Sequence, residues 1–311
     1  MRPFHFLADA REIVSGTELA ARARRSEDLG YHALVTPDHL MGQLSPVVAM
    51  SAIAAATSTL RVGAFVLNND LRHPAVLAQD LAAIDVLSDG RLDIAIGAGW
   101  NKPEYDALGI PFDATPVRQA RLAEAIAVLK GSLSGEQFSF DGEYYRITDY
   151  TGEPAAQRPH PPLFVGGGGR RTLTLAGREA DIVGLAPRIT RTGLDAWSLT
   201  VEATREKIEW VREAAGARFA ELEFNVYPSG WPPVLTDDLA GEVSKVIASL
   251  AERTGLELTE RQVLDSPHLF IGSADRLAEK FQQLREELGI SSFLLGSVGE
   301  LEPVLSKLAG S

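Results

Sequence analysis

The stretch from Val66 to Pro111 reads VLNNDLRHPAVLAQDLAAIDVLSDGRLDIAIGAGWNKPEYDALGIP. It predicts the end of a strand, a polar turn, a helix, and a second strand that ends at the Gly97-Ala98-Gly99-Trp100 segment. Polar residues and glycines therefore follow two consecutive strands on the same side of the fold. In barrels of alternating strands and helices, ligands bind on that side.

The rest of the chain repeats this alternation of strand and helix. We expect eight strands, at residues 4–8, 33–36, 60–67, 92–96, 163–165, 181–185, 221–226 and 291–295. Helical patterns lie between them, and one of these runs from Thr115 to an end at Gly131. This pattern predicts an α/β protein built as one (β/α)8 TIM barrel, a single domain over residues 1–311.

Three segments interrupt the alternation and are expected to be insertions, near residues 136–160, 186–200 and 227–268. The first contains a hairpin pattern that turns at Asp141-Gly142. The second and third begin with stretches that we expect to be long loops, over Ala186–Ser198 and Tyr227–Thr236.

Composition excludes several classes of protein. The net charge of −12 argues against a general affinity for nucleic acid. Cysteine is absent, which excludes disulfides and a cysteine nucleophile, and the histidines lack metal-binding spacing, so no metal is expected. No apolar run resembles a signal peptide or approaches the roughly 20 residues of a membrane helix, so we expect a cytoplasmic protein that does not bind membranes.

Several segments together resemble the luciferase-like monooxygenase superfamily, and within it the oxidoreductases that use the deazaflavin coenzyme F420. The segments are PDH at 37–39, VLNND at 66–70, RHPAVLAQDLAAIDVLSDGRLDIAIGAGW at 72–100, EYDALGIPF at 104–112, HPPLFVGGGGRRTLTLAGREADIVGL at 160–185 and GSADRLAEKFQQLREELGISSF at 272–293. The resemblance covers nearly the whole chain. It implies a luciferase-like barrel, a flavin-type cofactor and a homodimer.

A run of four glycines follows the fifth expected strand. Glycines there can adopt positive φ and let backbone N–H groups approach a phosphate, and the next helix begins with arginines at a position that favours anions. The resemblance implies that this loop holds the cofactor phosphate, whereas the run could also be only a flexible turn. The expected phosphate ligands are Gly166, Gly167, Gly168, Gly169 and Arg171.

The segments after the third and fourth strands are candidates for holding the cofactor ring. The resemblance implies that Asn68, Asn69 and Asp70 form a bulge with a non-proline cis peptide bond behind the ring, between Leu67 and Leu71. The small residues Gly97, Ala98 and Gly99 would let a planar ring lie against the backbone. Trp100 either borders the substrate or packs as an ordinary aromatic residue.

Two side chains are candidates for moving a proton. His39 ends the second strand, beside Asp38, which could fix the tautomer of its imidazole. Glu104 lies where a helix begins, and related deazaflavin enzymes can use a carboxylate in this area. Alternatively, His39 is a structural histidine and Glu104 is a solvated glutamate. His73, at a helix entry, is expected to be structural.

The resemblance therefore implies an enzyme that transfers a hydride between F420 ring carbon C5 and a small organic substrate, in either direction. One alternative is an FMN-dependent monooxygenase that uses oxygen and reduced flavin from a partner flavin reductase. A second alternative is a flavin-binding barrel without catalysis. Substrate identity would lie in the weakly matched loops, Ala186 to Ser198 and Tyr227 to Pro267, and in the Phe138 to Ile147 insertion.

Overall fold

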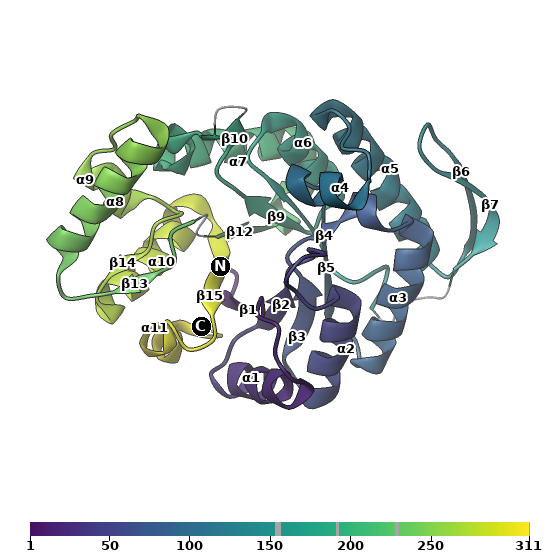
Figure 1. Cartoon of the computed structure of the whole chain (residues 1–311), viewed down its shortest axis with the longest axis horizontal. Coiled ribbons are helices and arrows are strands. Elements are labelled where there is room, and N and C mark those ends of the chain that lie inside the picture. The colour runs from purple at the N-terminus through teal and green to yellow at the C-terminus, as the bar shows by residue number, and fades with distance from the viewer. Residues whose placement is uncertain (153–156, 191–192, 228–229, 311) are drawn as a thin grey trace. The chain divides into compact units, whose positions relative to one another are not determined.

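The computed structural model describes residues 1–152, 157–190, 193–227 and 230–310. The chain forms two compact units, whose elements are labelled in Figure 1. Unit 1 contains Met1–Asp9, Asp28–Ala33 and Val165–Ser311, and unit 2 contains Ala10–Glu27 and Leu34–Phe164.

Unit 2 alternates short parallel strands with helices. Strands β3 (Arg61–Ala64) and β4 (Leu67–Asn68) both pair in parallel with β5 (Leu92–Gly97). The helices and strands around them are α1 (Gly16–Asp28), β2 (Ala33–Thr36), α2 (Pro46–Ala56), the 3-10 helix η1 (Asn69–Leu71), α3 (Pro74–Leu87), α4 (Lys102–Leu108), α5 (Thr115–Leu133), β6 (Gln137–Asp141), β7 (Arg146–Thr151) and, at the boundary of the unit, β8 (Leu163–Gly167). Because parallel strands joined by helices end at one edge, residues that follow β4 and β5 come close together.

The third expected strand is interrupted, and the bulge lies earlier than predicted. Leu67 lies four positions after Gly63, whereas their partners Asp93 and Ile96 on β5 are three positions apart, so one extra residue is accommodated between β3 and β4. The non-proline cis peptide bond is there, at Phe65–Val66. The prediction of a bulge and cis bond at residues 67–71 was therefore wrong in position, because Leu67 and Asn68 have already resumed pairing with β5.

Helix α5 does not end at Gly131, as the sequence had predicted, but continues to Leu133. Gly131 faces the ring of Phe138, and a Cβ at this position would come within 2.6 Å of that ring. The glycine is there for close packing of the following strand rather than for ending the helix. That strand, β6, pairs antiparallel with β7, which confirms the expected hairpin.

Unit 1 contains a parallel sheet in the order β1 (His5–Asp9), β15 (Ile290–Ser297), β12 (Glu223–Val226) and β9 (Ile182–Leu185). The unit also contains the helices α6 (Arg170–Glu179), α7 (Val201–Ala215) and α10 (Ala274–Leu288). The shorter elements are β10 (Ile189–Thr190), β11 (Gly193–Leu194), η2 (Ala196–Leu199), η3 (Gly216–Glu221) and α11 (Glu302–Leu308). Helix α10 begins at the side-chain cap Ser273 and ends at Gly289 with φ +70°, as its sequence predicts.

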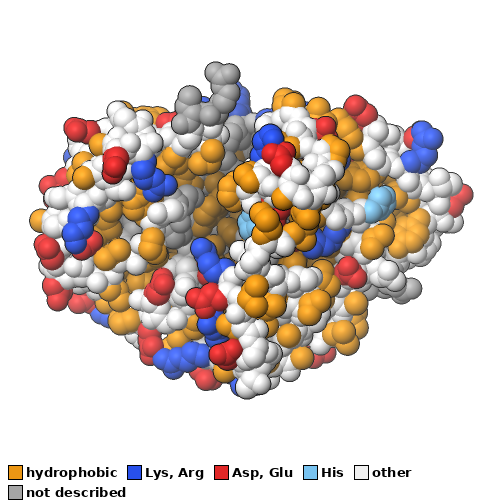
Figure 2. Space-filling view, viewed as in Figure 1, with side chains coloured by type: hydrophobic (Ala, Val, Ile, Leu, Met, Phe, Trp, Pro, Cys, Tyr) orange, Lys and Arg blue, Asp and Glu red, His pale blue; other side chains and the backbone are white. Residues whose placement is uncertain are grey.

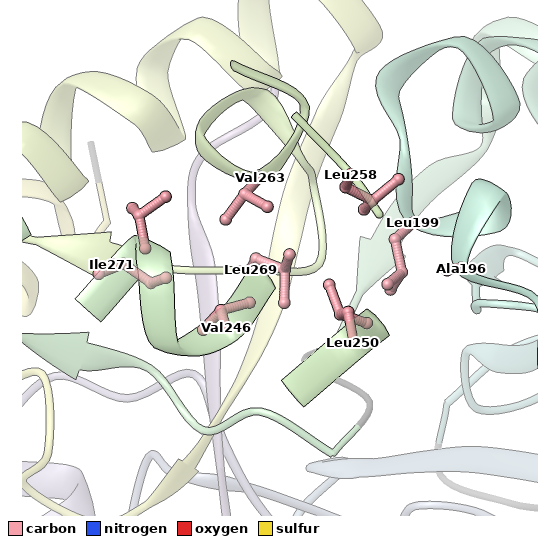
Figure 3. Close-up of a cluster of buried hydrophobic side chains, with 9 residues drawn as sticks. Ala196, Leu199, Val246, Leu250, Leu258, Val263, Leu269 and Ile271 are labelled. Atoms are coloured by element: carbon pink, nitrogen blue, oxygen red, sulfur yellow. The ribbon is translucent and has the colours of Figure 1, made fainter. Parts of the chain in front are cut away.

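The third expected insertion forms a small layer of its own in unit 1. It comprises α8 (Leu239–Thr254), α9 (Glu260–Asp265) and the parallel pair β13 (Val234–Leu235) and β14 (Ile271–Gly272). These elements share a cluster of buried apolar side chains with η2, drawn in Figure 3. Residues 186–198 are not only a loop, because β10 and β11 pair antiparallel within them. Parts of the expected insertions, at 153–156, 191–192 and 228–229, lie outside the described residues.

The surface carries charges of both signs. Figure 2 shows acidic and basic side chains interspersed with apolar ones on the face in view. Among the described residues, no helix combines the length and the hydrophobicity needed to cross a membrane.

Candidate functional site

A histidine and a buried glutamate meet at the strand ends of unit 2. His39, which follows β2, places its Nδ1 3.1 Å from Glu104 Oε2. Glu104 is 1% exposed, and its other carboxylate oxygen accepts a hydrogen bond from the backbone N–H of Leu40. The expectation of a solvated Glu104 was therefore wrong. The pair presents an imidazole whose orientation is fixed from behind by a carboxylate, which is the arrangement of a group that exchanges protons.

Asp38 does not orient His39, contrary to the sequence-based expectation. Its carboxylate forms a two-pronged ion pair with the Arg72 guanidinium, with distances of 2.6 and 3.0 Å, and accepts a hydrogen bond from the backbone N–H of Asn68 at 2.8 Å. Because these contacts occupy both oxygens, Asp38 fixes the turn after β4, and Glu104 orients the histidine.

His39 and Glu104 line a small hollow of about 60 Å³. Trp100 stands beside it, with its indole edge-on to the His39 ring at a centroid distance of 5.7 Å. Trp100 is 73% exposed, so it is not a packed core aromatic. A hollow of this volume admits the edge of a ring or one substituent. Its lining residues are Asp38, His39, Phe65, Val66, Asn68, Gly99, Trp100, Asn101 and Glu104.

A buried tyrosine fixes the floor of the hollow. The Tyr105 hydroxyl lies 2.9 Å from Asn68 Oδ1 and 3.0 Å from Asp70 Oδ2. Burial, together with the nearby Asp70 carboxylate, raises the pKa of Tyr105 to about 12, so the hydroxyl keeps its proton and donates it. Gly99 lies directly above with φ +75°, and a Cβ there would overlap the hydroxyl. A glycine at this position is therefore required by both conformation and space.

Helix α5 supports three loops of the site with three side chains, Arg118, Arg121 and Glu124, which we call the α5 stripe. Arg118 donates to the carbonyl oxygens of Ala98 and Gly99. Arg121 donates to Asp70 Oδ1 at 2.8 Å, and Glu124 accepts from the backbone of the β6–β7 turn. Residues three positions apart lie on neighbouring turns of one helix face, so one stripe reaches all three loops.

The glycine run lies in unit 1. Gly166 to Gly169 are all within the described part of the chain and none has a positive φ, so the expected conformational role was wrong. Space explains part of the run, because a Cβ at Gly168 would come within 2.6 Å of Arg188 Cα, and one at Gly167 within 2.9 Å of the Thr172 methyl group. Gly169 has open space around it and forms the N-cap of α6, whose second residue is the exposed Arg171.

The structure therefore brings together the predicted residues His39, Asn68, Gly99, Trp100 and Glu104 around one hollow. Asp70 and Gly97 support them, since Asp70 accepts from Tyr105 and Gly97 leaves room for the Val66 side chain. His73 caps α3, as expected of a structural residue. Sequence reasoning missed Tyr105 and the α5 stripe, whose signal is charged residues repeating every third position of a helix.

Within the described ranges, no group of three or more His, Cys, Asp or Glu side chains is arranged to hold a metal ion. The side chains that line the hollow include an imidazole, carboxylates, an indole and side-chain amides.

Comparison with known proteins gives the family. The profile of the luciferase-like monooxygenase family matches residues 3–237. An FMNH2-dependent dimethylsulfone monooxygenase from Pseudomonas putida is 39% identical over 220 residues, which cover 69% of this chain and 55% of that protein. An F420-dependent glucose-6-phosphate dehydrogenase from Kineococcus radiotolerans is 35% identical over 184 residues, covering 57% of this chain and 54% of that protein. The matches thus span about half the length of these two relatives.

A solved structure shows the same fold. The coenzyme F420-dependent tetrahydromethanopterin reductase from Methanopyrus kandleri superposes with a TM-score of 0.77 at 19% identity, over 100% of this chain and 98% of that one. The expected (β/α)8 TIM barrel is thereby confirmed. With its strand-end hollow and a family profile that matches most of its length, the chain belongs to the luciferase-like monooxygenase family.

Proposed function

We propose that this chain is an F420-dependent oxidoreductase that transfers a hydride between ring carbon C5 of the deazaflavin and a small organic substrate. The His39–Glu104 pair carries the proposal. Adding a hydride to a carbonyl carbon, or removing one from an alcohol carbon, must be accompanied by a proton at the oxygen. An imidazole held by a buried carboxylate can supply or accept that proton.

The residues around the hollow fit a planar ring. When bound, the deazaflavin would supply the redox chemistry. Trp100 offers an exposed indole face that a ring could cover. Because Gly99 has no side chain, such a ring could also approach the backbone at this position. In unit 1, the start of α6 presents backbone N–H groups and the exposed Arg171, which favours a phosphate. The protein would thus orient the ring, exclude water and move one proton at His39 Nε2.

FMN is the second candidate, and one observation favours it. The relative from Pseudomonas putida, 39% identical over 220 residues, is named as FMNH2-dependent. In that case the chain would be a monooxygenase supplied with reduced flavin by a partner reductase. A flavin-binding barrel without catalysis is the third candidate, and it leaves the His39–Glu104 pair without a role.

We also propose that the chain is a homodimer. Helices α2 and α3 pack against each other and bury apolar side chains on one face. They also expose apolar side chains, among them Val48, which is 67% exposed, and Leu87, which is 76% exposed. A surface helix that is apolar on both faces indicates a covering partner. A second copy of the chain would supply such a cover.

Titration of the purified apo-protein with F420 and with FMN tests the choice of cofactor. We expect tighter binding of F420, and hydride transfer to a carbonyl acceptor without oxygen consumption. Arg171→Ala should weaken binding several-fold through the phosphate, whereas Arg170→Ala should not, because Arg170 already pairs with Glu213 at 2.9 Å. Tight FMN binding with oxygen consumption would contradict the proposal in favour of a monooxygenase.

A further inference from the structure

The tip of the β6–β7 hairpin is fixed to α5 by a single carboxylate. Glu124 accepts hydrogen bonds from the backbone N–H groups of Glu143 and Tyr144 at 2.8 Å and of Tyr145 at 3.1 Å. Gly142 lies so close that a Cβ there would overlap this carboxylate. In β6 exposed and half-buried residues alternate, whereas β7 has two consecutive exposed residues, Thr148 and Asp149. Glu124 therefore fixes three consecutive backbone N–H groups of the tip to α5.

From this tip, Tyr145 reaches the strand-end residue Asn69. Asn69 Nδ2 donates a hydrogen bond to the Tyr145 hydroxyl oxygen at 3.2 Å. The Tyr145 ring meets the His73 ring edge-on at a centroid distance of 5.4 Å, and His73 in turn caps α3. Tyr145 is thus held by its backbone, its ring and its hydroxyl group.

We infer that Tyr145 is a positioning residue, which turns the Asn69 side chain so that its carbonyl oxygen faces the ligand. A side-chain amide carries donors on one side and an acceptor on the other. The donor side is directed at Tyr145, while Asn69 Oδ1 makes no hydrogen bond to the residues that the structure describes. The amide therefore presents an acceptor to a ligand with an N–H group.

The chemical class of that ligand follows from the acceptor. This step rests on the proposed function and on the expectation from the family resemblance that Asn69, which directly follows the hollow-lining Asn68, lies beside the cofactor ring. The pyrimidinedione ring common to flavins and deazaflavins has one imide N–H between two carbonyl groups. An acceptor oxygen is the complement of that N–H, so the hairpin tip would set the orientation of the ring through Asn69.

Tyr145→Phe tests this role, because it removes the hydroxyl group and keeps the ring on His73. Tyr150→Phe is the matched control: it makes the same change in β7 of the same hairpin, where the ring packs edge-on against Phe138 at 6.1 Å. Binding of FMN, of F420 and of 3-methyl-FMN, which lacks the imide N–H, is measured by flavin fluorescence. The melting temperature of each variant is measured alongside.

We expect Tyr145→Phe to weaken binding of FMN and F420 about tenfold and to leave the melting temperature unchanged. The control Tyr150→Phe should bind both cofactors as tightly as the wild type does. The methylated flavin should bind about tenfold more weakly to the wild type, with no further loss in Tyr145→Phe, because both changes remove one interaction. Equal binding by wild type and Tyr145→Phe, or losses that multiply, would overturn the role of Tyr145. A wild-type chain that binds neither cofactor would instead overturn the proposed function.

Discussion

Glu104 and Asp106 lie two residues apart on α4 and differ completely in environment. Glu104 is buried against His39, whereas Asp106 is exposed and pairs with Lys102. We expect Glu104→Gln to lower kcat at least tenfold, because a neutral amide cannot stabilise a protonated imidazole, while the Kd for the cofactor changes less than twofold. Asp106→Asn should leave both constants unchanged. Steady-state kinetics with cofactor titration checks this, and equal kcat values for Glu104→Gln and wild type would contradict it.

Gly99 and Gly109 offer a second comparison between single residues. Both have positive φ, at +75° and +67°, but a Cβ at Gly109 meets nothing within 4 Å, whereas one at Gly99 overlaps the Tyr105 hydroxyl. Gly109→Ala should reduce the free energy of unfolding by about 1 kcal/mol through conformation alone. Gly99→Ala should reduce it by roughly 1–3 kcal/mol more through overpacking, and should weaken cofactor binding. Urea denaturation of both variants measures the difference, and equal losses would show that Tyr105 moves aside freely.

At the scale of elements, Lys207 of α7 holds the segment that contains β10 and β11. Its ammonium donates to the carbonyl oxygens of Ala186 and Ser198, and burial lowers the pKa of Lys207 to about 8 from an ordinary value of 10.5. Between these values the unfolded chain binds a proton that the folded chain has released. The free energy of unfolding should therefore rise with pH from about 8 to 10.5, with a slope of up to about 1.4 kcal/mol per pH unit from this group.

Lys207→Met removes this titration and should flatten the rise in stability relative to wild type. Urea denaturation at pH 8, 9 and 10 measures the slope, and groups shared by both proteins cancel in the difference. Lys245→Met is the control, because the Lys245 side chain is 71% exposed. A slope in Lys207→Met equal to that of wild type would contradict the assignment.

At the scale of the whole molecule, the proposed homodimer predicts a change in mass. The double substitution Val48→Glu and Leu87→Glu would place charges on the exposed faces of α2 and α3. It should convert a dimer into a monomer. Ile13→Glu also changes an exposed apolar residue, 62% exposed, but lies outside these helices and should leave the mass unchanged. Size-exclusion chromatography with light scattering distinguishes the two, and a monomeric wild type would contradict the dimer.

The barrel and the position of the site were predictable, because hydrophobic periodicity marks strands and the polar residues after them mark the ligand side. His39 could be named for this reason and Glu104 from the family resemblance, although their contact spans 65 positions of the chain. Residues that lie so far apart in the chain leave no local pattern in the sequence. For this reason the sequence predicts the wrong hydrogen-bond partner for Asp38 and gives no indication of the role of Tyr105. The bulge at Phe65–Val66 and the continuation of α5 past Gly131 depend on tertiary pairing and packing, which sequence patterns do not contain.

The α5 stripe has a consequence for recognising related chains. Three turns of one helix each support a different loop, so the seven residues R-x-x-R-x-x-E from 118 to 124 act as a compact search pattern. A homologue that keeps both arginines but lacks the glutamate should retain the loop after β5 and the turn after β4, and should have a shorter or undocked hairpin. Gain or loss of one acidic residue would then mark where this accessory hairpin was acquired or abandoned during divergence.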